Sequence, residues 1–213
     1  MFRRLTILVF LICLCKTIPL LAQKIEFGAG AGMMHYKGDI EPALHVMAAK
    51  PAANLFFRYN ASKALSLRAS FTGGRIYGSE VHSSDVYQQN RGIIFGTRIM
   101  EGSADLEYNF LDYQYVRQRP RNWSPYVFAG LGFFNFKPDQ IPSASYRKNG
   151  LSIPFGAGIK WQIKSPWSIG IEFGTRKTWT DYLDNYAAAP QKDLYYYSCL
   201  SISYTILNII CPE

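Results

Sequence analysis

The sequence has no uninterrupted apolar stretch of the roughly 20 residues that a membrane-spanning helix requires. The uncharged run near its start, Leu5 to Cys15, has 11 residues and is ended by Lys16. The mean hydropathy is only -0.07. These features exclude a protein of several transmembrane helices. They do not exclude a transmembrane β-barrel, because the strands of a barrel carry apolar residues only at every second position.

The residues that usually build enzyme and metal sites are sparse. The chain has 4 Cys, without a CxxC motif or a Cys/His cluster, and its three histidines, His35, His45 and His82, are scattered. No nucleophile has the sequence context of a Ser-His-Asp constellation. We therefore predict no catalytic residue, no metal and no cofactor, and expect that the protein is not an enzyme. A small lipid-modifying barrel enzyme is a remote alternative.

Composition favours one folded domain. The 213 residues include 4 Trp, 15 Tyr and 14 Phe, whereas disordered chains are poor in aromatic residues. The length suits a single domain better than a multidomain enzyme. The 23 Lys and Arg outnumber the 15 Asp and Glu, but the bases do not cluster with interleaved aromatic residues, so no nucleic acid is expected as a partner.

The first 22 residues have the pattern of a secretory signal peptide. Arg3 and Arg4 precede an apolar core from Leu5 to Leu14, and a small-residue site ends at Ala22. We predict a signal peptide over residues 1–22 and an exported domain over 23–213. Without residues 1–22, 20 Lys and Arg face 15 Asp and Glu, so the exported domain is moderately basic.

Strict alternation of apolar and polar residues predicts β-strands. In residues 65–72, for example, Leu65, Leu67 and Phe71 alternate with Ser66 and Arg68. Eight such segments are found, at roughly 24–36, 50–60, 63–77, 92–110, 123–136, 150–163, 166–179 and 194–209. Most exceed the five or six residues usual in soluble strands and meet the nine to eleven that a tilted strand needs to cross a bilayer.

Eight long strands predict an all-β fold, an eight-stranded antiparallel up-and-down transmembrane barrel of the outer-membrane type. The links at 60–63 and 164–166 are short, whereas those at 37–49, 78–91, 137–149 and 180–193 are long and polar. Outer-membrane barrels have short periplasmic turns and long external loops. We therefore expect an outer-membrane location, contact with its lipid, and both termini in the periplasm. The link at 111–122 breaks the pattern, because it is long where a periplasmic turn is expected.

The row opposite the apolar row carries charge, and we expect it to face the barrel interior. Five acids and four bases are nearly balanced, so they can pair where little water reaches them. Because an eight-stranded barrel is just wide enough for side chains to fill, no solute channel is predicted. The predicted interior charge network comprises Glu26, Arg58, Arg68, Glu101, Asp105, Glu107, Lys160, Glu172 and Arg176.

Two further features of the strands carry expectations. A change of phase in the fourth strand predicts a β-bulge near Gly102. Aromatic residues near strand ends predict an interfacial belt, with ordinary core aromatics as the alternative. The predicted belt comprises Trp123, Tyr126, Trp161, Trp167, Trp179 and Tyr195 to Tyr197.

Several segments, taken in order, resemble the PorG-like outer-membrane barrel family of the type IX secretion system, over nearly the whole exported domain. They are residues 35–40 (HYKGDI), 51–60 (PAANLFFRYN), 104–110 (ADLEYNF), 123–132 (WSPYVFAGLG), 151–160 (LSIPFGAGIK) and 169–182 (IGIEFGTRKTWTDY). The resemblance implies a non-enzymatic barrel that associates with periplasmic ring proteins of the PorK and PorN types and holds the ring at the outer membrane.

The unusual link at 111–122 carries Arg117, Arg119 and Arg121. Arginine is suited to forked contacts with carboxylates. We hypothesise that these three residues bind a periplasmic partner, the alternative being a basic loop without one. The alternative to a secretion accessory is a stand-alone structural or adhesive barrel that works through its external loops.

Overall fold

The structure, a computed structural model, describes residues 24–37, 49–79, 94–111, 121–139, 148–179 and 194–206. The predicted signal peptide lies outside them. No helix long and apolar enough to cross a membrane is found in these ranges. The strands are β1 (Lys24–Lys37), β2 (Lys50–Asn60), β3 (Leu65–Ser79), β4 (Ile94–Asn109), β5 (Trp123–Pro138), β6 (Asn149–Lys164), β7 (Trp167–Thr178) and β8 (Leu194–Ile206).

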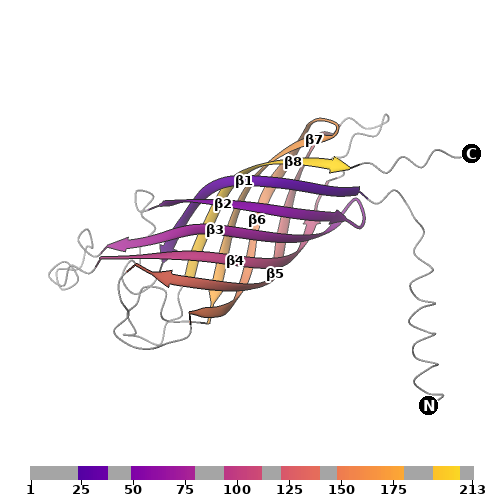
Figure 1. The fold of residues 1–213 in the computed structure, drawn as a ribbon. Coiled ribbons are helices and arrows are strands. Elements are labelled where there is room, and N and C mark those ends of the chain that lie inside the picture. Colours follow the sequence, from indigo (N-terminus) through magenta and orange to yellow (C-terminus); the bar gives the residue numbers. More distant parts are fainter. Residues whose placement is uncertain are drawn as a thin grey trace, which may run out of the picture.

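The eight strands form one closed barrel in sequence order, and every neighbouring pair is antiparallel. β1 also pairs with β8, from Ile25 opposite Ile206 to Lys37 opposite Leu194, which closes the sheet. Figure 1 shows β1 and β8 side by side. The predicted fold class is confirmed. Strand lengths from 11 residues in β2 to 16 in β4, β5 and β6 are sufficient to span a bilayer.

The connections separate the barrel into two ends. The turns at 61–64 and 165–166, the start of β1 and the end of β8 share one end, here called the turn end. The opposite end, the loop end, is where β1, β3, β5 and β7 finish. Ser62 shapes the first turn, because its Oγ accepts hydrogen bonds from the backbone of Leu65 at 2.9 Å and Ala64 at 3.3 Å. The connection between β4 and β5 also belongs to the turn end.

The predicted bulge near Gly102 is wrong. Gly102 pairs in unbroken register with Phe71 on β3 and with Phe133 on β5. The outer row of β4 follows the even-numbered residues without a change of phase from Arg98 to Tyr108, so Arg98 is an outward-facing charged residue toward the loop end. The register shift in the barrel lies instead between β6 and β7, at Gln162 and Lys164.

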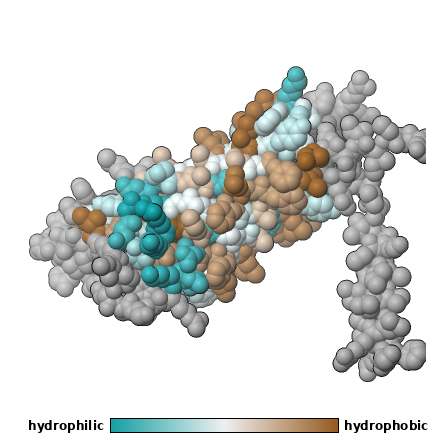
Figure 2. Space-filling view, in the orientation of Figure 1, coloured by the Kyte–Doolittle hydropathy of each residue, from teal (hydrophilic) through white to brown (hydrophobic). Residues whose placement is uncertain are grey.

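The outside of the barrel is apolar over its middle. Leu131, Leu200 and Leu55 are 70%, 65% and 64% exposed, and hydrophobic side chains cover the middle of the face in Figure 2. A protein in water buries such residues, and contiguous apolar patches of this extent mark contact with another apolar phase. The exterior is therefore built to contact lipid.

The aromatic belt was predicted correctly only for outward-facing residues. Trp123, Trp167 and Trp179 lie at or beside strand ends and are 40–50% exposed. Tyr126, Tyr195 and Tyr197 are at most 3% exposed and point into the barrel, so the prediction is wrong for them. They occupy the inner row of β5 and β8, where neighbouring side chains cover them.

Candidate functional site

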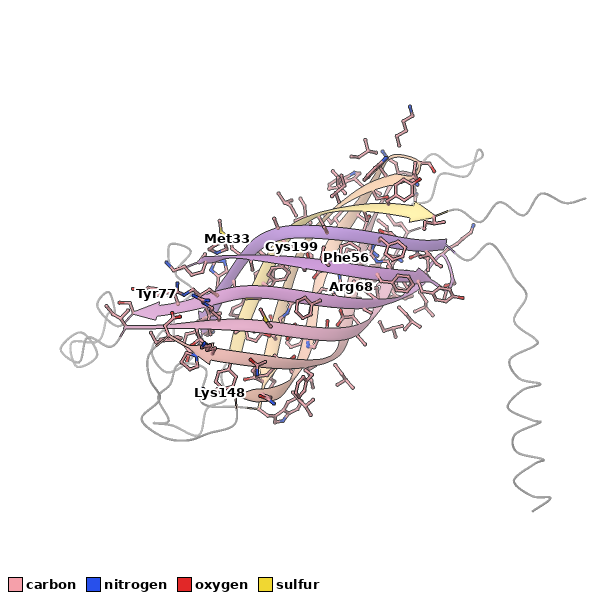
Figure 3. All side chains as sticks on the ribbon, in the orientation of Figure 1. Met33, Phe56, Arg68, Tyr77, Lys148 and Cys199 are labelled. Carbon is pink, nitrogen blue, oxygen red and sulfur yellow. The ribbon has the colours of Figure 1, made fainter. Side chains whose placement is uncertain are left out.

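The structure places all nine residues of the predicted charge network on the inner face, each at most 4% exposed. Alternation is the cause, because residues two apart on a strand point to the same face. On β4, for example, Glu101, Asp105 and Glu107 point inward while Leu106 points outward. Arg68 lies in the part of the barrel near the turn between β2 and β3 (Figure 3).

Glu107 is the centre of the network. Its carboxylate oxygens lie 2.8 Å from Nε of Arg58 and 3.2 Å from Nη1 of Arg68. Nζ of Lys160 also donates to it, and donates a second hydrogen bond to Oδ1 of Asn109 at 3.1 Å. One carboxylate thus forms ion pairs with cations from three different strands, β2, β3 and β6.

Arg68 joins Glu107 to two further carboxylates. Its Nη2 lies 3.2 Å from Oδ2 of Asp105, and its Nη1 donates to Glu172 across the barrel. The hydroxyl of Tyr126 donates to Glu172 at 2.7 Å. Arg58 extends the network to β1 through its ion pair with Glu26. Buried charges of this kind are tolerable because they are paired and hydrogen-bonded.

Glu101 forms a second group nearer the loop end. It pairs with Nε of Arg176 at 3.5 Å and accepts a hydrogen bond from the Ser152 hydroxyl at 2.7 Å. The Tyr195 hydroxyl donates to the same carboxylate. Tyr195, which the sequence analysis assigned to the interfacial belt, is therefore part of the hydrogen-bonded interior network.

Every cation of the network also lies against an aromatic ring. The distances from the cation to the ring centroid are 4.2–4.9 Å, within the range of a favourable cation–π contact. The rings hold the cations without competing for the carboxylates. The pairs are Arg58 with Phe56, Arg68 with Phe128, Lys160 with Tyr126 and Arg176 with Tyr197.

An apolar cluster fills the interior toward the loop end, and sequence reasoning missed it. Ile99 of β4 is 1% exposed, and Phe134 and Phe136 of β5 are fully buried. The signal was an apolar residue on both rows, as where Phe133 is followed by Phe134. Water is thereby excluded from that part of the interior. The cluster comprises Met34, Tyr36, Ala52, Ile76, Phe95, Ile99, Phe134, Phe136, Tyr195, Tyr197 and Cys199.

Several inner glycines make space for aromatic rings. A Cβ on Gly28 would lie 2.1 Å from the ring of Phe56, and one on Gly158 would lie 2.7 Å from Tyr126. Both rings are those that hold a network cation. The inner glycines therefore make room partly for the rings that contact the cations and partly for charged side chains themselves.

The predicted partner-binding arginines lie only partly within the described structure. Arg117 and Arg119 lie outside the described residues, whereas Arg121 is exposed at the turn end, two residues before Trp123. The base of this connection is tied to the barrel: Leu111 N donates to Ser124 Oγ at 3.0 Å.

The described ranges contain no group of three or more His, Cys, Asp and Glu side chains arranged to hold a metal. Cys199 is buried in the apolar cluster, and Cys211 lies outside the described residues. In the interior, the carboxylates and cations of the network neutralise one another.

Several solved structures are similar in fold, including the following three. The attachment invasion locus protein Ail of Yersinia pestis, solved with the heparin analogue sucrose octasulfate, has 16% identity and a TM-score of 0.53, covering 87% of this chain and all of its own. The N-terminal barrel domain of Pseudomonas aeruginosa OprF has 15% identity and a TM-score of 0.51, covering 86% and 97%. Neisserial surface protein A has 9% identity and a TM-score of 0.54, covering 86% and 97%.

Curated proteins yield no match to the sequence. A family model does match, over residues 4–208, and its description is a domain of unknown function, DUF6089. The match extends across all eight strands and therefore concerns the whole barrel. The chain belongs to the DUF6089 family.

Proposed function

We propose that this protein is a non-enzymatic outer-membrane barrel that serves as an accessory or anchoring component of the type IX protein secretion machinery and associates with its periplasmic ring. The observation that carries the proposal is the filled interior. Paired charges and the apolar cluster occupy the space inside the strands, so the barrel offers partners its ends and outer surface rather than a channel.

The choice of the type IX machinery depends on the resemblance of the strand segments to the PorG-like family. The segments at 51–60, 104–110, 123–132 and 151–160 all lie in strands or directly beside them. An eight-stranded barrel with short links at one end favours the turn end, with both termini, in the periplasm. The ring components of the PorK and PorN types would then meet the turn end.

The contact surface that we propose is the connection between β4 and β5. It lies at the turn end, and its base is held by the hydrogen bond of Leu111 to Ser124 and by that of Gln162 N to Asn122 O at 2.6 Å. Arg121 extends from this fixed base. Arg117, Arg119 and Arg121 would engage carboxylates of the ring proteins by forked hydrogen bonds.

The test is a pull-down of the tagged protein from native outer membranes in mild detergent, with mass spectrometry of co-purifying proteins. We expect periplasmic ring proteins with the wild type and at least about tenfold less with Arg117, Arg119 and Arg121 all replaced by Ser, since the loss of even one charge-assisted contact of about 1.5 kcal/mol weakens binding about tenfold. Heat-modifiable gel mobility verifies that the barrel is folded.

The matched control replaces Lys63 and Lys164, two exposed basic residues of the other turn-end connections, by Ser. It should leave the recovery of ring proteins unchanged. Equal recovery with the triple arginine variant would reject the contact surface. A folded wild-type barrel recovered alone would reject the secretion role and favour a stand-alone structural or adhesive barrel.

A further inference from the structure

Among the described residues, carboxylates lie almost entirely inside the barrel, beside the interior cations, whereas the exposed charged residues are mostly basic. The described ranges contain six carboxylate side chains, and five of them belong to the interior network. The sixth is Asp139 at the loop end. The exposed basic residues of the same ranges are Lys63, Arg75, Arg98, Arg121, Lys137, Lys148, Lys164 and Lys177. Counted over the described residues alone, the two rims are therefore basic, with the apolar band between them.

Three of these residues form a cluster across neighbouring strands. Arg75 of β3 pairs in register with Arg98 of β4, which pairs in register with Lys137 of β5. We call these three residues the basic cluster. Asp139 forms an ion pair with Arg75. Tyr77, two residues beyond Arg75, marks the same end of β3 in Figure 3.

The register makes this arrangement unfavourable for the protein by itself. Like charges directly opposite each other on a sheet destabilise it. Neighbouring strands are roughly 4.8 Å apart, so the three Cα atoms span about 10 Å. Among the described residues Asp139 supplies one carboxylate for three cations. The cluster would be stabilised by an anion that spreads charge over about this width.

The depth of the cluster identifies the kind of anion. Arg98 lies two residues from Met100, which is 62% exposed, or roughly 6.6 Å along the strand. The headgroup region of a bilayer is about 5–7 Å thick on each side of the hydrocarbon. The cluster therefore lies close to the edge of the hydrocarbon, within reach of lipid headgroups.

The surface directly below the cluster suits acyl chains. Phe133 and Phe71 are 56% and 55% exposed, and they flank Gly102 in register. A Cβ added to Gly102, or to Gly73 below Arg75, would meet nothing within 4 Å. Unlike the inner glycines, these two glycines leave shallow depressions in the outer surface beside large apolar side chains. Hydrophilic residues adjoin hydrophobic ones on this face in Figure 2.

We propose that the basic cluster binds the phosphate groups of a phosphorylated glycolipid in the outer leaflet, with its acyl chains on the apolar surface of β3, β4 and β5. Arg75 and Arg98 contact phosphate oxygens through their guanidinium groups, and Lys137 adds a point charge. The inference depends on the outer-membrane placement with the loop end outward, and it does not depend on a role in secretion.

The test compares binding of bis-phosphorylated lipid A and of the same lipid after removal of both phosphates. The full-length wild-type protein in detergent is titrated with each lipid and bound lipid is counted by native mass spectrometry. The variant replaces Arg98 and Lys137 by Ser, which leaves the Arg75–Asp139 pair intact. A basic residue near an anionic surface contributes about fivefold to binding, so we expect about 25-fold weaker binding of the phosphorylated lipid.

The matched control replaces Lys164 and Lys177, two exposed basic residues away from the cluster, by Ser. Lys164 lies at the turn end, and the register places Lys177 about six residues from the level of Lys137, or roughly 20 Å along the strands. The affinity of this control should remain within about twofold of the wild type, because surface charges beyond a Debye length are largely screened. Heat-modifiable mobility shows that each variant is folded.

Three results would overturn the proposal. The first is equal affinity of the wild type for the two lipids, and the second is unchanged affinity of the double variant. The third is that an excess of inorganic phosphate, about 10 mM, displaces bound lipid as effectively as added lipid A does. The first two deny phosphate recognition at this cluster, and the third assigns the site to a free anion. None of these results affects the pull-down of ring proteins, so failure here and failure of the secretion role remain separate.

Discussion

Replacing Glu107 by Gln would show whether the interior is stabilised by specific pairs or by overall balance of charge. The interior holds five carboxylates and four cations, and the change leaves four of each. If balance decided stability, Glu107→Gln would be harmless. If pairing decides it, the variant loses stability, because Arg58, Arg68 and Lys160 all contact this carboxylate.

The contacts favour the second outcome. Removing one partner of a buried ion pair costs about 3–5 kcal/mol. Glutamine keeps the volume and one acceptor oxygen, and Arg68 keeps Asp105 and Glu172, so we expect a loss of about 3 kcal/mol, at the lower end of that range. With a urea slope of about 1–3 kcal/mol per M, the unfolding midpoint should fall by about 1–3 M.

The assay is urea unfolding of the refolded barrel in lipid vesicles, followed by tryptophan fluorescence and by heat-modifiable mobility. Adding Lys160→Met to Glu107→Gln removes one of the cations that lost its partner. The double variant should therefore be at least about 1 kcal/mol more stable than the sum of the single losses predicts. Lys63→Gln on the exposed turn is the control. A midpoint for Glu107→Gln equal to that of wild type, or strict additivity, would refute the pairing argument.

Three further variants test the remaining layers of the barrel. Gly28→Ala should lower the thermal midpoint, because the new Cβ would lie 2.1 Å from the ring of Phe56. Gly102→Ala is the control and should leave the midpoint unchanged, because its Cβ would meet nothing within 4 Å. Equal midpoints for the two variants would contradict the account of the inner glycines. Phe134→Ala should reduce the free energy of unfolding by about 3–5 kcal/mol, since the ring is fully buried, and a loss below about 1 kcal/mol in urea titrations would show that the apolar cluster is loosely packed. Leu131→Lys should cost about 2–4 kcal/mol of stability in bilayers, because Leu131 lies at the middle of β5 and is 70% exposed. A loss of stability that is smaller in bilayers than in detergent would contradict the lipid-facing position.

The alternation of residue types was sufficient to predict eight strands and the closed barrel, because a period of two is a local property of the chain. The boundaries were less accurate. The third strand was expected at 63–77 and runs over Leu65–Ser79, since the Ser62 turn holds residues 61–64 out of the sheet. Residues 92–93 and 207–209 of two predicted strands lie outside the described ranges.

The inner row could be recognised from its parity, but the partners within it could not. The contact of Arg68 with Glu172 joins residues 104 positions apart and depends on the closure of the barrel. The apolar cluster was missed for a different reason. Apolar residues on both rows are a local signal, but the sequence alone does not show that those on the inner row, such as Ile99, pack together at one end of the barrel.

The pairing of the first strand with the last has a consequence for biogenesis. Ile25 and Ile206 are opposite each other in the sheet, so the barrel cannot close until nearly the whole chain has been delivered. Contacts between residues so distant in sequence form slowly, because loop-closure entropy must be overcome first. Until then β1 and β8 are open edges, and the inner charges lack the partners that closure supplies. Insertion into the bilayer and closure must therefore be coupled, and a chain truncated before β8 should be a substrate for periplasmic proteolysis rather than a smaller barrel.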